Sequence, residues 1–152
     1  MIYLSQRDPE WKGKLLGASK LTMGDYGCTT TCISMLSDYF KPWVSPAVIA
    51  ANKNNYTRDG LVLWDKLELP TFKFEKRLRI RNDSEIMASV EDPRKAVILE
   101  VEIPKGRHWL VCLGKEIFGS GYRVVDPWDA RKKSTSAYGN LITGSAHFIR
   151  KI

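Results

Sequence analysis

The period of the hydrophobic residues changes halfway along the chain, and this change limits the folds that the chain can adopt. Over residues 29–40 apolar side chains recur at helical spacing, which predicts a helix with one buried stripe. From Phe72 onward, apolar and charged residues alternate in FKFEKRLRI, and short apolar runs follow, as is typical of strands. Helices that precede strands in this order predict an α+β fold, with N-terminal helices packed on a C-terminal antiparallel sheet.

Caps and helix breakers predict the remaining elements. Ser45 followed by Pro46 indicates the start of a short helix that runs to residue 51, and residues 60–67 are expected to form another. Asp83 or Ser84 is expected to cap a helix to about residue 90. On the first strand, the buried face is expected to carry Phe72, Phe74, Leu78 and Ile80. Further strands are expected at 95–103, 108–113, 121–125 and 147–152. A chain of 152 residues without repeats or a linker predicts one domain, 1–152.

The charge of the chain favours anionic partners. Lysine and arginine total 24 against 17 acidic residues, a net charge of +7 that suits nucleic acid, a membrane surface or an anionic cell-wall polymer. Basic residues gather at Lys73, Lys76, Arg77, Arg79, Arg81, Arg131, Lys132 and Lys133. No recognised nucleic-acid motif accompanies them, so we expect no nucleic-acid partner. We also expect no transmembrane segment and no secretory signal, and hence synthesis in the cytoplasm.

Cys28 stands where a reactive thiol would be placed. It follows Gly27 and directly precedes the predicted helix, so its sulfur is expected at a helix N-terminus. The free N–H groups and the dipole there stabilise a thiolate and lower the pKa of a thiol. Cys28 is therefore a candidate nucleophile, and a buried structural cysteine is the alternative.

His108 and Asp126 are expected to meet across a hairpin. His108 begins one predicted strand, and Asp126 ends the next, so that the acid can orient the imidazole beside Cys28. His147 is the rival base, and turn capping is the alternative role for Asp126. A zinc site built from Cys28, Cys32, His108 and Cys112 fits poorly, because four residues along a strand span roughly 13 Å. Cys32 and Cys112 are therefore expected in the core, and we expect no metal and no cofactor.

The order of four segments resembles a known family. SQRDPEW, YGCTTTCISML, RHWLVCLG and YRVVDPWD follow one another as in papain-like cysteine peptidases of the C39-like branch. These are stand-alone relatives of bacteriocin leader-processing peptidases, common in Gram-positive bacteria and their phages. The resemblance implies a papain-like fold in which Cys28 is the nucleophile, His108 the general base and acid, and Asp126 its orienting partner. It also implies that Gln6 and the Cys28 backbone N–H stabilise the oxyanion.

The resemblance leaves several functions open. In the transporter-fused leader peptidases the glutamine lies close to the cysteine, whereas here Gln6 is 22 residues upstream and Thr22 occupies the near position. We therefore expect a peptidase or amidase that cleaves peptidoglycan, as an endolysin does, after release to the cell wall. The alternatives are a protein-processing peptidase, another acyl transferase on the same fold, and a catalytically idle binding or virion module.

Overall fold

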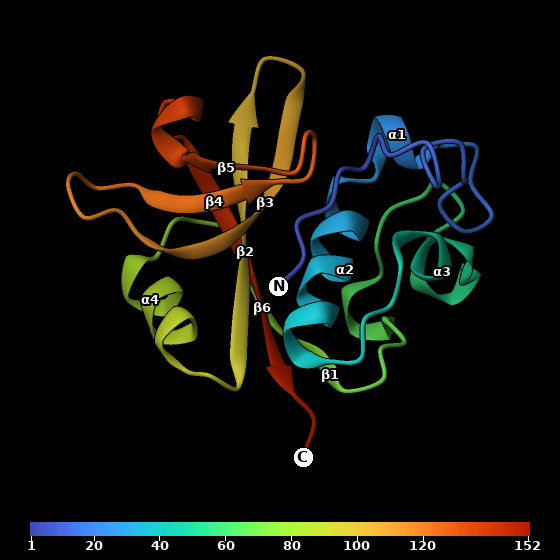
Figure 1. Ribbon diagram of the computed structural model, residues 1–152, viewed down its shortest axis with the longest axis horizontal. Helices are drawn as coiled ribbons and strands as arrows, with labels where there is room; N and C mark the ends of the chain where they lie inside the picture. Colours follow the sequence, from blue (N-terminus) through green and yellow to red (C-terminus); the bar gives the residue numbers. More distant parts are fainter.

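Six antiparallel strands form one sheet with helices on both faces (Figure 1). The computed structural model describes residues 1–152. The strands are β1 (Phe72–Leu78), β2 (Lys95–Ile103), β3 (Gly106–Lys115), β4 (Tyr122–Asp126), β5 (Arg131–Ser134) and β6 (Ile142–Arg150), in the spatial order β1-β6-β2-β3-β4-β5. The helices are α1 (Met23–Tyr26), α2 (Cys28–Phe40), α3 (Pro46–Ala51) and α4 (Asp83–Glu91). Short 3₁₀ turns are η1 (Lys53–Asn55), η2 (Trp64–Lys66) and η3 (Thr135–Tyr138). The predicted α+β class and antiparallel sheet are confirmed.

The central strand β2 is buried on both faces, which explains its continuous apolar sequence. Ala96 and Ile98 point into the core beneath α2, whereas Val97, Leu99 and Val101 point into a second core beneath α4. Because side chains alternate along a strand, one run of apolar residues supplies both cores. The two layers of helices therefore hold β2 and β3 in a fixed position between them.

Several predicted elements match closely. The helix expected over 29–40 is α2, and the strand expected over 95–103 is β2. Ser45 caps α3 by accepting a hydrogen bond from the Val48 N–H, with Pro46 in the first turn, as expected. No helix in the chain is long and apolar enough to cross a lipid bilayer.

The prediction of which β1 side chains lie on the buried face is wrong, because the strand contains a β-bulge. The register of β1 against β6 shifts between Phe74 and Lys76, so that Arg77 turns toward the aromatic core. Ile80 lies beyond the strand and is 72 % exposed. A bulge reverses the alternation of side chains, and the apolar pattern alone does not reveal it.

Other differences concern local backbone geometry. Residues 60–67 form only the 3₁₀ turn η2, because Gly60 adopts a positive φ of 86° and Val62 bridges to Tyr56. The cap of α4 is Asn82, whose side chain accepts from the Glu85 N–H, rather than Asp83 or Ser84. The strand β5 was not predicted, and β6 begins at Ile142, before the expected residue 147.

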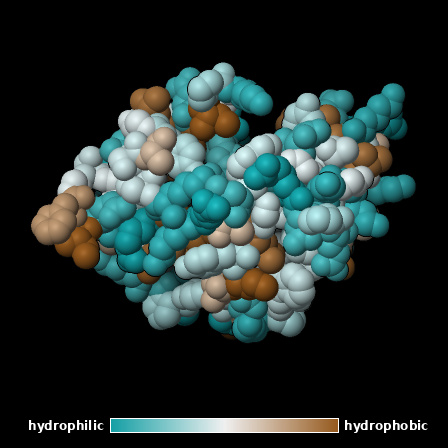
Figure 2. Space-filling model, turned by 45° about the horizontal axis from the view of Figure 1, so that its top comes forward, coloured by the Kyte–Doolittle hydropathy of each residue, from teal (hydrophilic) through white to brown (hydrophobic).

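The connection between β3 and β4 exposes two large apolar side chains. Ile117 is 86 % exposed and Phe118 is 90 % exposed. Figure 2 shows a hydrophobic projection at its left edge, on the side where Figure 1 draws this connection. Neither residue contributes to the two cores.

His147 is a buried neutral histidine. Its Nδ1 lies 2.7 Å from Ser89 Oγ and its Nε2 lies 2.8 Å from Ser145 Oγ. Burial, with a contribution from Lys76, lowers the pKa of His147 to about 4. The rival base therefore lies in the interior, engaged at both ring nitrogens.

We expect the free energy of unfolding to fall as the pH decreases from about 6.5 to about 4. In this range the unfolded chain gains a proton on His147, whereas the folded chain does not, and the loss amounts to about 2 kcal/mol. Urea unfolding at several pH values measures it. The variant His147→Asn keeps all the carboxylates of the wild type. Its pH dependence of the unfolding free energy is therefore expected to lack only the contribution of His147. An equal pH dependence in both proteins would contradict the prediction.

Candidate active site

The N-terminus of α2 positions Cys28. Gly27 separates α1 from α2, and a Cβ at Gly27 would lie 2.4 Å from the Met23 carbonyl oxygen. Only glycine allows this close approach. No side chain caps the N-terminus of α2. Cys28 is therefore partly buried at a helix end whose N–H groups are free to stabilise negative charge.

The edge of β3 lies open beside this helix end. Paired residues of β3 and β4 end at Val111 and Val125, so the earlier residues of β3 pair only with β2. At that edge the Trp109 carbonyl accepts a hydrogen bond from Cys32 Sγ at 3.5 Å. The Trp109 N–H acts to lower the pKa of Cys28. The first turn of α2 thus occupies the place that a longer β4 would take.

His108 and Asp126 meet at the same edge. His108 lies three residues before Val111 on β3, and Asp126 directly follows Val125 on β4, so they are diagonal neighbours on one face. His108 Nε2 lies 2.7 Å from Asp126 Oδ1, and both residues are buried. This contact confirms the proximity expected from the hairpin. It also leaves Nδ1 as the ring nitrogen that is free to face Cys28.

Cys28 and His108 shift each other's pKa. Burial acts to raise the pKa of the Cys28 thiol, but the hydrogen bond and charge of His108 outweigh it, so that this pKa is lowered. Burial acts to lower the pKa of His108, yet Asp126 and Cys28 raise it to about 9. Both shifts act in the same sense, because each favours the charged pair of thiolate and imidazolium over the neutral pair.

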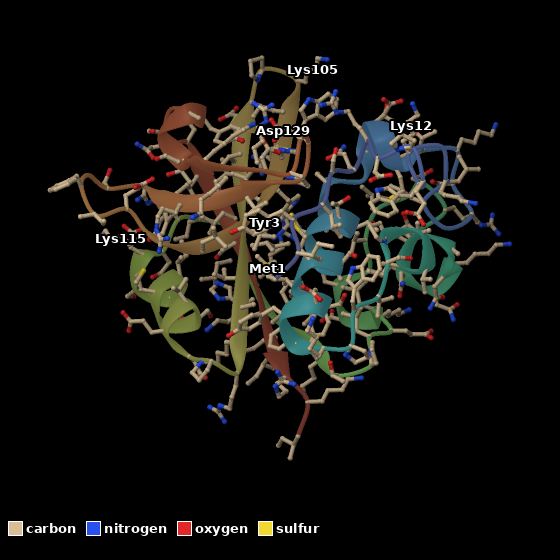
Figure 3. The ribbon with its side chains drawn as sticks, viewed as in Figure 1. Met1, Tyr3, Lys12, Lys105, Lys115 and Asp129 are labelled. Carbon is tan, nitrogen blue, oxygen red and sulfur yellow. The ribbon has the colours of Figure 1, made fainter.

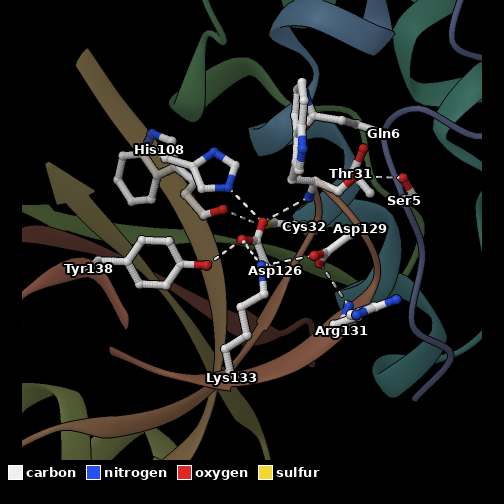
Figure 4. A network of polar contacts seen from close by, with 12 residues as sticks. Ser5, Gln6, Thr31, Cys32, His108, Asp126, Asp129, Arg131, Lys133 and Tyr138 are labelled. Atoms are coloured by element: carbon white, nitrogen blue, oxygen red, sulfur yellow. Dashed lines mark hydrogen bonds and ion pairs between the residues drawn. The ribbon is translucent and has the colours of Figure 1, made fainter. Parts of the chain in front are cut away.

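Asp126 is held by more donors than the histidine alone (Figure 4). Its Oδ1 accepts from the Trp128 N–H at 2.8 Å, and its Oδ2 accepts from Lys133 Nζ at 3.0 Å and from the Tyr138 hydroxyl. Burial acts to raise the pKa of Asp126, but the hydrogen bonds from His108 and Tyr138 hold it well below its ordinary value. The carboxylate thus stays ionised and fixed in direction.

Sequence reasoning missed Lys133 and Tyr138 as partners of Asp126. Lys133 appeared only as part of a basic cluster, and Tyr138 was not singled out. Lys133 pairs across the sheet with Val124, which places it on the same face as Asp126. Recognition of DPWDAR as a hairpin turn would have found Lys133, whereas no local signal marks Tyr138.

Gln6 lies against the residues that precede Cys28. Its N–H donates to the Pro127 carbonyl at 2.6 Å, and its side-chain Nε2 donates to the Gly24 carbonyl at 3.1 Å. Gly24 is four residues before Cys28, so the carbonyl that Gln6 binds is the one that a continuous helix would offer to the Cys28 N–H. The amide nitrogen retains a second hydrogen, and the buried Oε1 has no partner.

The remaining cysteines lack activating partners. Burial raises the pKa of Cys32 well above its ordinary value and that of Cys112 to about 12. Cys32 is buried and Cys112 is partly buried, and no disulfide forms. No group of three or more His, Cys, Asp or Glu side chains is arranged to hold a metal ion. The lowered pKa singles out Cys28 among the three thiols.

Comparisons with protein-family models, with curated proteins and with solved structures found no match to this chain. The class of the site is therefore inferred from its own geometry.

We expect Gly27→Ala to destabilise the protein by about 2 kcal/mol or more, because the new methyl group would collide with the Met23 backbone. Gly13→Ala is the matched control, since nothing lies within 4 Å of a Cβ there. Thermal unfolding of the two variants measures the difference. Equal melting temperatures of the two variants would show that α1 and α2 accommodate the new methyl group without loss of stability.

Replacement of Asp126 is expected to weaken the electrostatic coupling between His108 and Cys28. In Asp126→Asn the pKa of His108 falls from about 9 toward its ordinary value, because the main partner that raises it loses its charge. The pKa of Cys28 then rises, since His108 is less charged near neutral pH. The rate of Cys28 alkylation as a function of pH measures this shift. A profile identical to that of the wild type would contradict it.

Proposed function

We propose that this protein is a cysteine peptidase or amidase with a papain-like fold of the C39-like branch. The observation that carries the proposal is the hydrogen bond between Asp126 and His108, together with the effect of His108 in lowering the pKa of Cys28 at the N-terminus of α2. Each residue type suits its role: a thiolate attacks, an imidazole transfers protons, and a carboxylate orients the ring.

The reaction follows from these contacts. The Cys28 thiolate attacks the carbonyl carbon of the substrate, and the carbonyl electron pair moves to oxygen as an oxyanion. The Cys28 N–H and the second Nε2 hydrogen of Gln6 donate to this oxyanion, each worth about 3 kcal/mol. His108 then gives its proton to the leaving amine, and a thioester remains on Cys28. Water, deprotonated by His108, hydrolyses the thioester and restores the thiolate.

Peptidoglycan is the substrate that we favour. The resemblance to enzymes of Gram-positive bacteria and their phages, together with the net charge of +7, supports action at an anionic cell wall after release from the cytoplasm. A protein-processing peptidase or another acyl transferase would use the same Cys28 chemistry. A catalytically idle binding module would not need this Cys28 chemistry, and the Cys28 thiol would then have an ordinary pKa.

Alkylation by iodoacetamide at pH 6 tests the nucleophile, because an ordinary thiol is almost fully protonated there. We expect rapid labelling confined to Cys28, located by peptide mapping, and labelling at least roughly tenfold slower in His108→Ala. Cys32 and Cys112 serve as internal controls. Slow labelling of Cys28 in the folded wild type would favour the idle module.

Turbidity of purified cell walls tests the substrate. We expect clearing by the wild type and none by Cys28→Ala, which removes the nucleophile without adding bulk. Activity is expected to decline above about pH 9, because His108 then loses the proton that the leaving amine requires. No clearing across several wall chemotypes, with Cys28 still readily alkylated, would redirect the search to protein substrates.

A further inference from the structure

Two arginines share one buried glutamate beside Trp109. Glu100 Oε2 lies 3.2 Å from an Arg77 guanidinium nitrogen, and Glu100 Oε1 lies 3.3 Å from one of Arg107. The Glu100 side chain is only 5 % exposed and also accepts from Thr143 Oγ1 at 2.9 Å. Among these three side chains, two positive charges therefore face one negative charge, and nearby Glu102, paired with Arg107 across the strands, and Arg79 add one charge of each sign.

The positive charge of this group is not fully matched by its surroundings. Burial lowers the pKa of Arg77, Glu100 raises it, and the neighbouring Arg79 and Arg107 lower it further. The Nε of Arg77 is buried and has no hydrogen-bond partner. The Arg107 side chain, in contrast, is 61 % exposed. The group thus combines unsatisfied positive charge with a guanidinium that an incoming molecule can reach.

This group lies next to the reacting thiol. The Arg77 guanidinium stands 5.3 Å from the ring centre of Trp109, whose backbone N–H acts to lower the pKa of Cys28. Arg107 directly precedes His108 on β3. The ring centres of Trp64 and Trp109 lie 5.2 Å apart, and the Arg77 guanidinium also lies over the Trp64 ring. Aromatic side chains therefore adjoin the two arginines. One tryptophan therefore separates the arginines from Cys28.

The same end of the molecule carries further lysines. Figure 3 shows Lys105 at the connection of β2 and β3, and Lys12 on the opposite half, beside α1. Neither forms an ion pair. Both lysines contribute to the net charge of +7, which favours an acidic substrate in general.

We propose that Arg77 and Arg107, held in place by Glu100, form a subsite for a carboxylate of the peptide substrate. The inference rests on the proposed function and names the class of substrate: a peptide with an acidic group on one side of the cleaved bond. A guanidinium binds a planar carboxylate with two parallel hydrogen bonds, and the fixed Arg77 keeps Glu100 from fully neutralising Arg107. The exposed Arg107 makes the first contact.

A matched pair of alkylating probes tests the subsite: the α-amides of N-iodoacetyl-glutamate and N-iodoacetyl-glutamine. They share the reactive group and nearly the same size, and differ in one negative charge. At pH 6 and low ionic strength, we expect the glutamate probe to label Cys28 roughly two- to five-fold faster than the glutamine probe. Peptide mapping restricts the measurement to Cys28.

Variants separate the subsite from the general charge of the protein. Arg107→Gln is expected to bring the ratio of the two rates close to one. Arg123→Gln removes the same charge from an exposed position on β4 and is expected to leave the ratio unchanged. Arg77 is left intact, because its loss would strand the buried Glu100.

The outcomes distinguish the two proposals. Rapid labelling by both probes at equal rates would overturn the subsite and leave the reactive thiol standing. An equal loss of preference in Arg107→Gln and Arg123→Gln would also overturn it, since net charge would then explain the effect. Slow labelling by both probes would contradict the proposed function and, with it, the subsite.

Discussion

The early end of the pairing between β3 and β4 is the constraint on which the candidate site depends. Because Pro127 follows Asp126 and turns the chain away, the edge of β3 at Trp109 keeps free backbone groups. Buried backbone groups require partners, and α2 supplies one at this edge, because Cys32 donates to the Trp109 carbonyl. The helical half and the sheet are thereby joined at the point where thiol, imidazole and carboxylate meet.

The chemistry of the site follows from how that junction is built. Asp126 accepts hydrogen bonds at both of its oxygens, so its position is determined from several elements at once: β3, the turn after β4, β5 and η3. A carboxylate fixed in this way keeps the His108 ring in one orientation. The ring in turn favours the thiolate of Cys28. Each residue therefore stabilises the charge of the next one, and burial strengthens these electrostatic interactions.

The same strand has a second role on its opposite face. His108 points to the Asp126 side of β3, whereas Arg107 and Trp109 point to the side of Glu100 and Arg77. Alternation along one strand therefore places His108 and Arg107 next to each other in sequence but on opposite faces of the sheet. The proposed carboxylate subsite depends on this alternation.

The class of fold, most elements and the proximity of His108 to Asp126 could be predicted from the amino-acid sequence. These features rest on local spacing: the helical period of α2, the apolar run of β2 and the turn at Asp126-Pro127. The sequence did not reveal the bulge that redirects Arg77, the strand β5, or the hold of Lys133 and Tyr138 on Asp126. These features depend on contacts between distant segments whose spacing along the chain carries no periodic signal, so they become visible only in the folded protein.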